Sequence, residues 1–157
     1  MEVRRVRDGE YVELRRVRLE SLAYAPGLQS HMDRERAAPE RFWRARATGG
    51  AAGTRRATFV AVKQGEFVGL VDGFLSDTGD VIEVGGMWVA PAERRAGVGR
   101  QLLDAVVAWA RDRGASRVAL WVRRSNTPAR LLYENYGFEH ASPSNHKEAG
   151  LRFELRV

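Results

Sequence analysis

One continuous stretch, residues 81–113, constrains the fold of this chain more than any other. It begins as an apolar run, Val81–Val89, which has the composition of a strand. It then passes through Pro91 and a glycine-containing loop into a helix, where apolar and charged residues recur at helical spacing and which we expect to end near Gly114. A strand that leads through a loop into a helix, with another strand-like run after it, predicts an α/β fold.

The loop between this strand and helix has the chemistry of an anion-binding site. The first N–H groups of a helix have no partner within it, and the helix dipole adds positive potential there. Gly97 and Gly99 lack a Cβ atom, so a phosphate can approach the backbone closely. Arg94, Arg95 and Arg100 add positive charge. The glycines alone would also suit a tight turn that binds nothing.

Two familiar phosphate motifs are absent from the loop. A Walker A loop ends in Lys-Ser or Lys-Thr, and the chain contains neither pair. A dinucleotide fingerprint needs a third glycine where this sequence has Leu102. What remains is the pattern R-x-x-G-x-G, at Arg94, Gly97 and Gly99, shortly after the Val-Ala-Pro that ends the strand.

Composition excludes several classes of protein. The chain of 157 residues has no cysteine, which excludes disulfides, thiolate catalysis and cysteine metal sites. Without a signal-peptide core or a membrane-length apolar run, we expect one cytoplasmic domain, residues 1–157, with no membrane association. The net charge is +6, but the arginines are interleaved with acids, which favours a solvated mixed-charge surface over a nucleic-acid-binding face. The histidines have no metal-site spacing.

The remaining segments predict helices followed by an antiparallel sheet. Asp8 can cap a first helix, and the Gly- and Ala-rich residues 47–57 lack periodicity, so we expect a mobile loop there. Three consecutive strands that include the central one are expected to form an antiparallel meander, and the crossover after it predicts a parallel pair. Strands are expected at 3–7, 58–62, 67–75, 81–89, 117–122 and 151–157. Helices are expected at 9–22, within 28–46, at 98–113 and from Thr127 or Pro128 to Tyr136. A polar loop is expected at 141–150.

A second motif lies after the strand expected at 117–122. Asn126 or Thr127 can cap a helix that Gly137 ends. The pattern N-x-x-A-x-x-L-Y-E-x-x-G-F runs from Asn126 to Phe138 and includes Tyr133. Together with R-x-x-G-x-G, in this order and at this separation, it resembles the two signatures of the GCN5-related N-acetyltransferase (GNAT) family. We therefore identify the chain as a member of that family.

The resemblance implies a fold and a donor substrate. The fold is a mixed α/β (α+β) GNAT type, with a central, mostly antiparallel sheet of six to seven strands flanked by about four helices. In this family the central strand and the strand after it splay apart, and acetyl-CoA, the acetyl donor, occupies the gap without a metal. Gly85 and Gly86 would mark the bulge that accompanies the splay.

The resemblance also implies roles for individual residues. The backbone of Met87, Trp88 and Val89 would bind the pantetheine arm, and Asn126 would contact the arm or the adenine side. Tyr133 would act as general acid and protonate the departing thiolate; its alternative is a core tyrosine. The pyrophosphate would lie at the loop residues Arg94, Arg95, Ala96, Gly97, Val98, Gly99 and Arg100.

The base is less clearly marked. In relatives that acetylate protein N-termini a Glu often precedes the Asn by five residues, and here that position is Trp121. This departure disfavours protein N-termini as acceptors. Glu83, the acid on the central strand, would activate the amine directly or through water, or else it is a solvated strand carboxylate.

The implied function is transfer of the acetyl group to a primary amine by direct attack in a ternary complex. The acceptor, a small molecule or a protein lysine, cannot be identified from the sequence, nor can a preference for longer acyl groups. Two alternatives remain: a non-catalytic acyl-CoA-binding regulatory module, and a basic nucleic-acid-binding domain. A homodimer is compatible with the resemblance.

Overall fold

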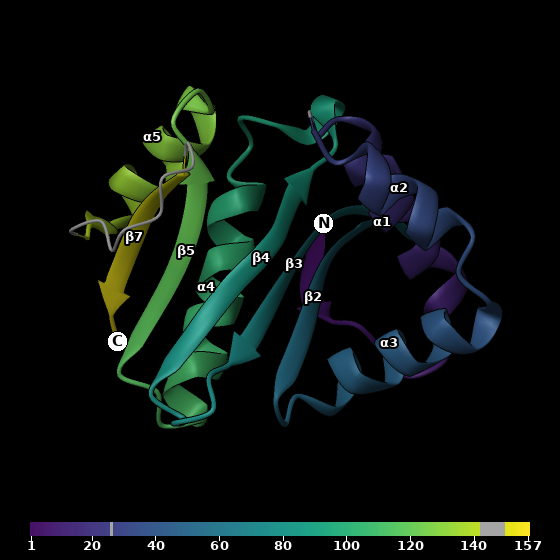
Figure 1. Cartoon of the computed structure of the whole chain (residues 1–157), viewed down its shortest axis with the longest axis horizontal. Coiled ribbons are helices and arrows are strands. Elements are labelled where there is room, and N and C mark those ends of the chain that lie inside the picture. Colours follow the sequence, from purple (N-terminus) through teal and green to yellow (C-terminus); the bar gives the residue numbers. More distant parts are fainter. Residues whose placement is uncertain (26, 142–149) are drawn as a thin grey trace.

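The computed structural model describes residues 1–25, 27–141 and 150–157, which form one seven-stranded sheet with helices on both faces (Figure 1). The strands are β1 (Glu2–Arg5), β2 (Arg56–Lys63), β3 (Glu66–Leu75), β4 (Val81–Val89), β5 (Arg117–Arg123), β6 (Glu139–His140) and β7 (Gly150–Arg156). The helices are α1 (Tyr11–Ala23), α2 (Gln29–Arg36), α3 (Glu40–Ala52), α4 (Val98–Asp112) and α5 (Thr127–Tyr136), with a 3-10 turn η1 (Pro91–Glu93).

The sheet has the strand order β1-β2-β3-β4-β5-β7-β6. All neighbouring strands are antiparallel except β4 and β5, which are parallel and are joined by α4. The predicted meander, the parallel crossover and the mostly antiparallel sheet of the GNAT type are therefore confirmed. Five helices flank the sheet in the described part of the chain, where the sequence indicated about four.

The two faces of the sheet carry separate cores. On one face, the apolar stripe of α4 packs on the sheet, and Leu102 and Leu103 are fully buried. On the other face, Leu14 and Val17 of α1 pack with Trp88 of β4. Burying each such aliphatic side chain stabilises the fold by about 1.5–3 kcal/mol. The central strands are therefore held from both sides.

The parallel pair β4 and β5 separates after a short stretch. Only Val81–Glu83 pairs with Arg117–Ala119, and beyond Glu83 the two described strands form no further residue pairs. On its other edge, β4 has a bulge, because Gly86 and Met87 lie opposite the single residue Val71 of β3. Gly86 has a φ of 62°, the left-handed conformation found at the first position of a glycine bulge. The predicted bulge and splay are both present.

The expectation of a mobile loop at residues 47–57 was wrong. Helix α3 continues through Ala52, and Ala47 and Gly50 are buried in it. A Cβ at Gly50 would collide with the side chain of Thr58, so the glycine is there to let the helix approach β2. The helix ends at Gly53, whose φ of 64° is the usual left-handed cap.

The helix cap expected at Asp8 was also wrong. Helix α1 begins at Tyr11 without a side-chain cap, and Asp8 instead accepts a hydrogen bond of 2.7 Å from the hydroxyl of Thr48. The side chain of Glu10 accepts a hydrogen bond of 2.7 Å from the backbone N–H of Arg7, and this bond stabilises the turn that precedes the helix. The polar loop expected at 141–150 lies, apart from its two end residues, outside the described residues.

Candidate active site

The N-terminus of α4 is an open group of backbone donors. Its N-cap is Gly97, which has a φ of 82° and no side chain to bond the first amides, and its first turn holds no acidic residue. No acceptor in the described part of the chain bonds the backbone N–H groups of residues 95–100. Arg95 also has a positive φ, 65°, a strained conformation for a residue with a side chain. These amides are therefore available to an anion.

The two glycines of the loop have different roles. A Cβ at Gly97 would meet no atom within 4 Å, so this glycine faces open space. A Cβ at Gly99 would lie 3.0 Å from Cδ2 of Leu132, which shows that Gly99 allows α4 and α5 to approach each other. The expectation that both glycines serve phosphate access is therefore incomplete, because Gly99 also has a packing role.

The arginines of the loop are held in different ways. The Nε of Arg94 donates to the backbone oxygen of Val89 at 2.9 Å and ties the loop to the end of β4. The guanidinium of Arg100 lies 5.1 Å from the ring centre of Tyr136, whose hydroxyl donates to Asp104 at 2.7 Å. Arg100 and Asp104 thus connect α4 with α5 beside the loop.

Beyond Glu83, the edge of β4 that faces β5 pairs with no strand among the described residues. This edge includes the backbone of Met87, Trp88 and Val89, although the Trp88 side chain is buried on the α1 face, with its ring centre 6.0 Å from that of Tyr24. An unpaired strand edge inside a sheet offers backbone donors and acceptors to an extended ligand.

Tyr133 combines a buried ring with an unbonded hydroxyl. The residue is 6% exposed, and its ring packs edge-on against Phe138 at 5.7 Å. Its hydroxyl bonds to no described residue, yet it is not among the fully buried unpaired atoms, so its tip is accessible. Burial raises the pKa of Tyr133 to about 12. The phenol therefore stays protonated at every pH at which the protein would work.

Asn126 acts as the N-cap of α5. Its side-chain oxygen accepts from the backbone N–H of Ala129 at 3.3 Å, as the sequence indicated. The residue is exposed, and its side-chain nitrogen Nδ2 forms no hydrogen bond with the described residues.

Glu83 is held by an arginine from another strand. Both of its carboxylate oxygens accept from Arg152 of β7, one of them at 2.7 Å. The guanidinium of Arg152 also lies 5.1 Å from the ring centre of Trp121. The Glu83 side chain is 40% exposed, so water reaches a carboxylate that is already charge-compensated. Trp121, the residue at the position of the missing family Glu, thus belongs to the same surface as Glu83.

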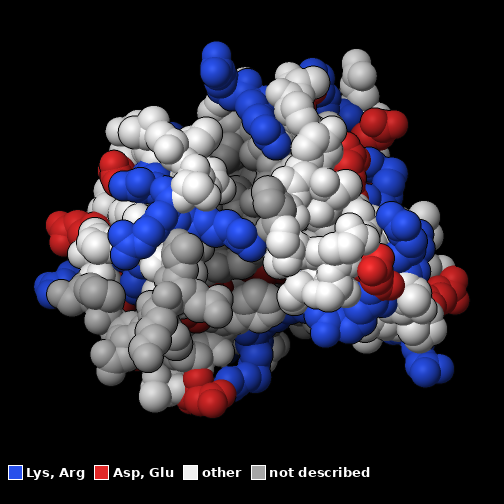
Figure 2. All heavy atoms as spheres, turned by 45° about the horizontal axis from the view of Figure 1, so that its top comes forward, with Lys and Arg blue, Asp and Glu red and all other residues white. Residues whose placement is uncertain are grey.

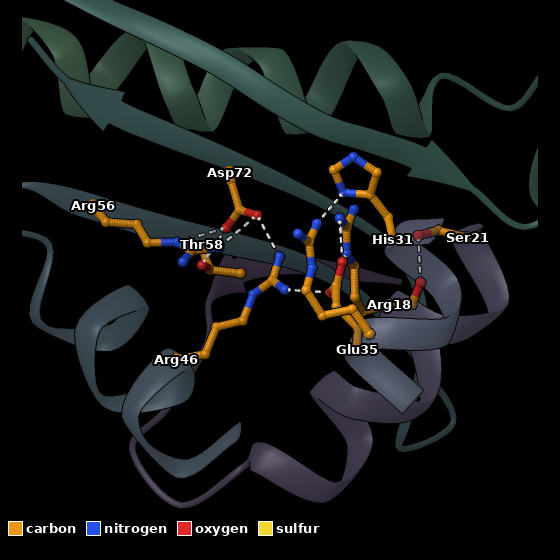
Figure 3. A network of polar contacts seen from close by, with 9 residues as sticks. Arg18, Ser21, His31, Glu35, Arg46, Arg56, Thr58 and Asp72 are labelled. Atoms are coloured by element: carbon orange, nitrogen blue, oxygen red, sulfur yellow. Dashed lines mark hydrogen bonds and ion pairs between the residues drawn. The ribbon is translucent and has the colours of Figure 1, made fainter. Parts of the chain in front are cut away.

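A network of charges on the α1–α3 face escaped sequence reasoning (Figure 3). Arg18 of α1 donates to Glu35 of α2 at 2.9 and 3.0 Å, and Arg46 of α3 donates to Glu35 at 2.8 Å. Arg46 also bonds Asp72 of β3 at 3.2 Å. Two residues of β2 complete the network at Asp72, with hydrogen bonds of 3.0 Å from Arg56 and 2.5 Å from Thr58.

Burial and charge act against each other in this network. Burial raises the pKa of Asp72, but the charges of Arg56 and Arg46 outweigh that effect, so the pKa lies below its usual value. Burial likewise raises the pKa of Glu35, and hydrogen bonding and attraction to Arg18 reverse the shift. Both carboxyl groups are therefore ionised and compensated by arginines.

The network reaches the bulge of β4. A Cβ at Gly86 would lie 3.5 Å from Nη1 of Arg18 and 3.5 Å from Oδ2 of Asp72. Gly86 itself is exposed. The described residues thus bring together a splayed strand pair, a bulge with buried charges beside it, and an open helix N-terminus.

A family profile described as "Acetyltransferase (GNAT) family" matches residues 15–138. The chain belongs to this acetyltransferase family. The match includes the splayed strands, the α4 loop and the α5 motif, so the family predicted from the two motifs is confirmed.

Individual GNAT relatives resemble parts of the chain. Over 90 residues it is 29% identical to aminoglycoside N(6')-acetyltransferase type 1 of Salmonella typhimurium, covering 53% of this chain and 62% of that protein. It is 39% identical over 88 residues to mycothiol acetyltransferase of Thermobispora bispora, covering 51% of this chain and 29% of that protein. The chain thus spans less than two thirds of the length of these relatives.

The GNAT fold extends over the whole chain. The crystal structure of PaiA N-acetyltransferase from Thermoplasma acidophilum, in complex with coenzyme A, superimposes with a TM-score of 0.81 at 16% identity, covering 99% of this chain and 98% of that one. In the present chain, no group of three His, Cys, Asp or Glu side chains among the described residues could hold a metal ion. Nor is any described helix long and apolar enough to cross a membrane.

Proposed function

We propose that this protein transfers the acetyl group of acetyl-CoA to a primary amine by direct attack in a ternary complex. The observation that carries the proposal is the open N-terminus of α4 beside the gap between β4 and β5. Its backbone amides at residues 95–100 bond to no described residue. A diphosphate fits the first feature and an extended pantetheine chain fits the second.

The donor would be held mainly by backbone groups. The amides of the loop, residues 95–100, would bind the pyrophosphate, with Arg95 and Arg100 adding charge while Arg94 fixes the loop to β4. The edge of β4 at Met87–Val89 would bond the pantetheine arm, and the amide of Asn126 would contact the donor from α5.

The reaction requires three things of the protein: removal of a proton from the amine, stabilisation of the oxyanion and donation of a proton to the departing thiolate. An alkylammonium has a pKa near 10, so the amine must lose a proton before its nitrogen attacks the thioester carbon. Glu83 would take that proton, directly or through water. As the N–C bond forms, the carbonyl oxygen becomes an oxyanion, which a backbone N–H of β4 would stabilise. Collapse breaks the C–S bond, and the thiolate would receive a proton from Tyr133.

The high pKa of Tyr133 limits what it can do. A phenol with a pKa of about 12 is a weaker acid than a thiol, whose pKa is near 8.5, so complete transfer to a free thiolate is uphill. The same burial keeps the phenol protonated and positioned. Tyr133 would therefore act as a hydrogen-bond donor that gives up its proton only as negative charge accumulates on sulfur.

One observation keeps the non-catalytic alternative open. Both carboxylate oxygens of Glu83, the candidate base, accept hydrogen bonds from Arg152, so the pair must open before an oxygen can meet the amine. A module that binds acyl-CoA without turnover would need only the loop and the gap. The cytoplasmic location and the homodimer stay predictions.

The first experiment is calorimetric titration with acetyl-CoA of the wild type, Gly97→Trp and Gly114→Trp. Both glycines have positive φ and open space around a Cβ, but they lie at opposite ends of α4. Each substitution costs about 1–3 kcal/mol of folding stability. We expect Gly97→Trp to weaken binding by about a hundredfold or more and Gly114→Trp to leave it unchanged.

Either of two results would overturn the cofactor site: a folded wild type that does not bind acetyl-CoA, or equal effects of the two substitutions. Binding without CoA release across a panel of amines and exposed lysines would favour the regulatory module.

A further inference from the structure

We propose that the acceptor is a primary amine that also carries an anionic group, either a carboxylate or a phosphate. The inference deepens the proposed function and rests on it, because it concerns the amine that would enter beside the bulge of β4. It follows from the charges that the described residues present on the α1–α3 face.

A free arginine nitrogen is held at the bulge. Nε and Nη2 of Arg18 donate hydrogen bonds to Glu35 at 2.9 and 3.0 Å, and this pair of bonds fixes the plane of the guanidinium. The remaining Nη1 bonds to no described residue, and it lies 3.5 Å from the position of a Cβ on the exposed Gly86. It is not among the fully buried unpaired atoms, so a ligand can reach it. The network thus presents one oriented cationic donor at the proposed reaction centre.

The carboxylates around this donor are already compensated. Glu35 is paired with Arg18 and Arg46, and Asp72 with Arg46 and Arg56. These three arginines and two carboxylates leave one excess positive charge. Glu83, across the sheet, is paired with Arg152. In the described part of the chain, no carboxylate near the bulge remains to bind a second ammonium group of an acceptor.

A second arginine lies across the gap. Arg123 is the last residue of β5 and lies beyond the segment of β5 that pairs with β4. Its Nη2 lies 2.9 Å from the position that a Cβ on Gly27 would take, in the connection between α1 and α2. The side chain is exposed and forms no ion pair with the described residues. Lys and Arg side chains, drawn blue, border the hollow at the centre of Figure 2.

These charges discriminate between classes of amine. An acceptor carboxylate or phosphate in the gap would be attracted by Arg18 Nη1, beside Gly86, and by the guanidinium of Arg123, beside Gly27. Charge-assisted hydrogen bonds from arginine to such groups are among the strongest in proteins. A polycation such as an aminoglycoside would bring further ammonium groups against two arginines with no free carboxylate beside them. The likeness to an aminoglycoside acetyltransferase therefore does not by itself lead us to expect an aminoglycoside acceptor.

The test compares kcat/KM for CoA release over two pairs of small amines, each an anionic amine beside a counterpart without the anionic group, and over two polyamines. The set is β-alanine, its neutral amide, ethanolamine, phosphoethanolamine, putrescine and neamine. We expect β-alanine and phosphoethanolamine each to exceed its neutral counterpart by about tenfold or more, and the cations to be slowest. The relative rates of β-alanine and phosphoethanolamine tell whether the site takes carboxylate or phosphate.

Arg123 is the residue to change, because it makes no ion pair with a described residue whose loss would disturb the fold. Arg123→Gln is expected to remove most of the preference, and Arg123→Glu to reverse it towards putrescine. The matched control is Arg113→Gln, an exposed arginine after the far end of α4. It is expected to leave both rates and preference unchanged.

Each outcome decides between the claims. Fastest transfer to neamine or putrescine, or a preference unaffected in Arg123→Gln, overturns the anionic acceptor while the acetyltransferase proposal stands. If acetyl-CoA binds but no amine reacts, binding of the same amines to the protein–CoA complex, measured by calorimetry, tests the anionic acceptor instead. Binding of an anionic amine that Arg123→Gln abolishes supports the inference, and equal or absent binding of all of them overturns it. A wild type that does not bind acetyl-CoA overturns the proposed function itself.

Discussion

Arg152 of β7 holds both carboxylate oxygens of Glu83 on β4, reaching across β5, which lies between the two strands in the sheet. The pair lies where β4 and β5 separate, because Glu83 is the last residue of β4 that pairs with β5. Because the candidate base is one half of this pair, its role can be tested from both sides.

Glu83→Gln is expected to lower kcat by about a hundredfold or more with little change in KM, because the amide cannot accept the amine proton. Arg152→Gln leaves the carboxylate in place and is expected to retain much of kcat. Steady-state kinetics with saturating acetyl-CoA check this prediction. Wild-type kcat in Glu83→Gln would assign the proton to water alone and leave Glu83 with a structural role.

Tyr133→Phe is expected to lower kcat by about a hundredfold while the free energy of unfolding stays nearly constant. The hydroxyl forms no hydrogen bond with the described residues, so its removal loses no internal contact. Since burial raises the pKa of Tyr133 to about 12, the wild-type rate should show no falling limb from this residue below about pH 11. A tyrosine-dependent decline between pH 8 and 10 would contradict the assignment, as would full activity in the variant.

Gly99→Ala is expected to destabilise the protein by about 1 kcal/mol or more, because the new methyl group would lie 3.0 Å from Leu132. Combining it with Leu132→Ala should recover part of that loss relative to the sum of the single changes. Denaturant unfolding of the two single variants and the double variant measures the coupling. Strictly additive effects would mean that Gly99 does not contact α5.

Asp72→Asn is expected to destabilise the protein by about 3–5 kcal/mol at neutral pH, because it removes the buried carboxylate that compensates both Arg46 and Arg56 and leaves the largely buried Arg46 with Glu35 alone among the described carboxylates. The folded-state pKa of Asp72 is depressed below its unfolded value of about 3.9. Its contribution is therefore fully present above about pH 4 and is lost as pH falls through the folded pKa.

The difference in unfolding free energy between wild type and Asp72→Asn should thus be constant from pH 7 to 5 and shrink below about pH 4. Denaturation series at fixed pH values check this. Asp77→Asn is the control, since Asp77 pairs with Arg55 only on the surface and should show little effect. A difference that grows towards low pH would reverse the sign of the argument.

The parts of the fold that sequence alone predicted are those coded locally. The periodicity of α4, the cap at Asn126 and the turn at Gly137 each depend on residues within a few positions of one another. The splay and the bulge at Gly86 were predicted through the family resemblance, which the two motifs carry.

The parts that could not be predicted depend on distant partners. Glu83 and Arg152 are 69 positions apart, and in a chain with 26 basic and 20 acidic residues no local pattern selects that pair. The same holds for Arg18, Glu35 and Asp72, which lie on three different elements. The glycines of α3 misled for another reason: a glycine that permits tight packing has the same local appearance as one that permits flexibility.

The separation of β4 from β5 also bears on the folded population of the protein. From Val84 onward, the β5-facing edge of β4 pairs with no strand in the described part of the chain, and an open strand edge invites pairing with other chains. A ligand lying along that edge would shield it and, by mass action, would shift the equilibrium towards the folded state. The cell's supply of acetyl-CoA would then govern how much of this protein escapes aggregation and proteolysis, quite apart from how fast it turns over.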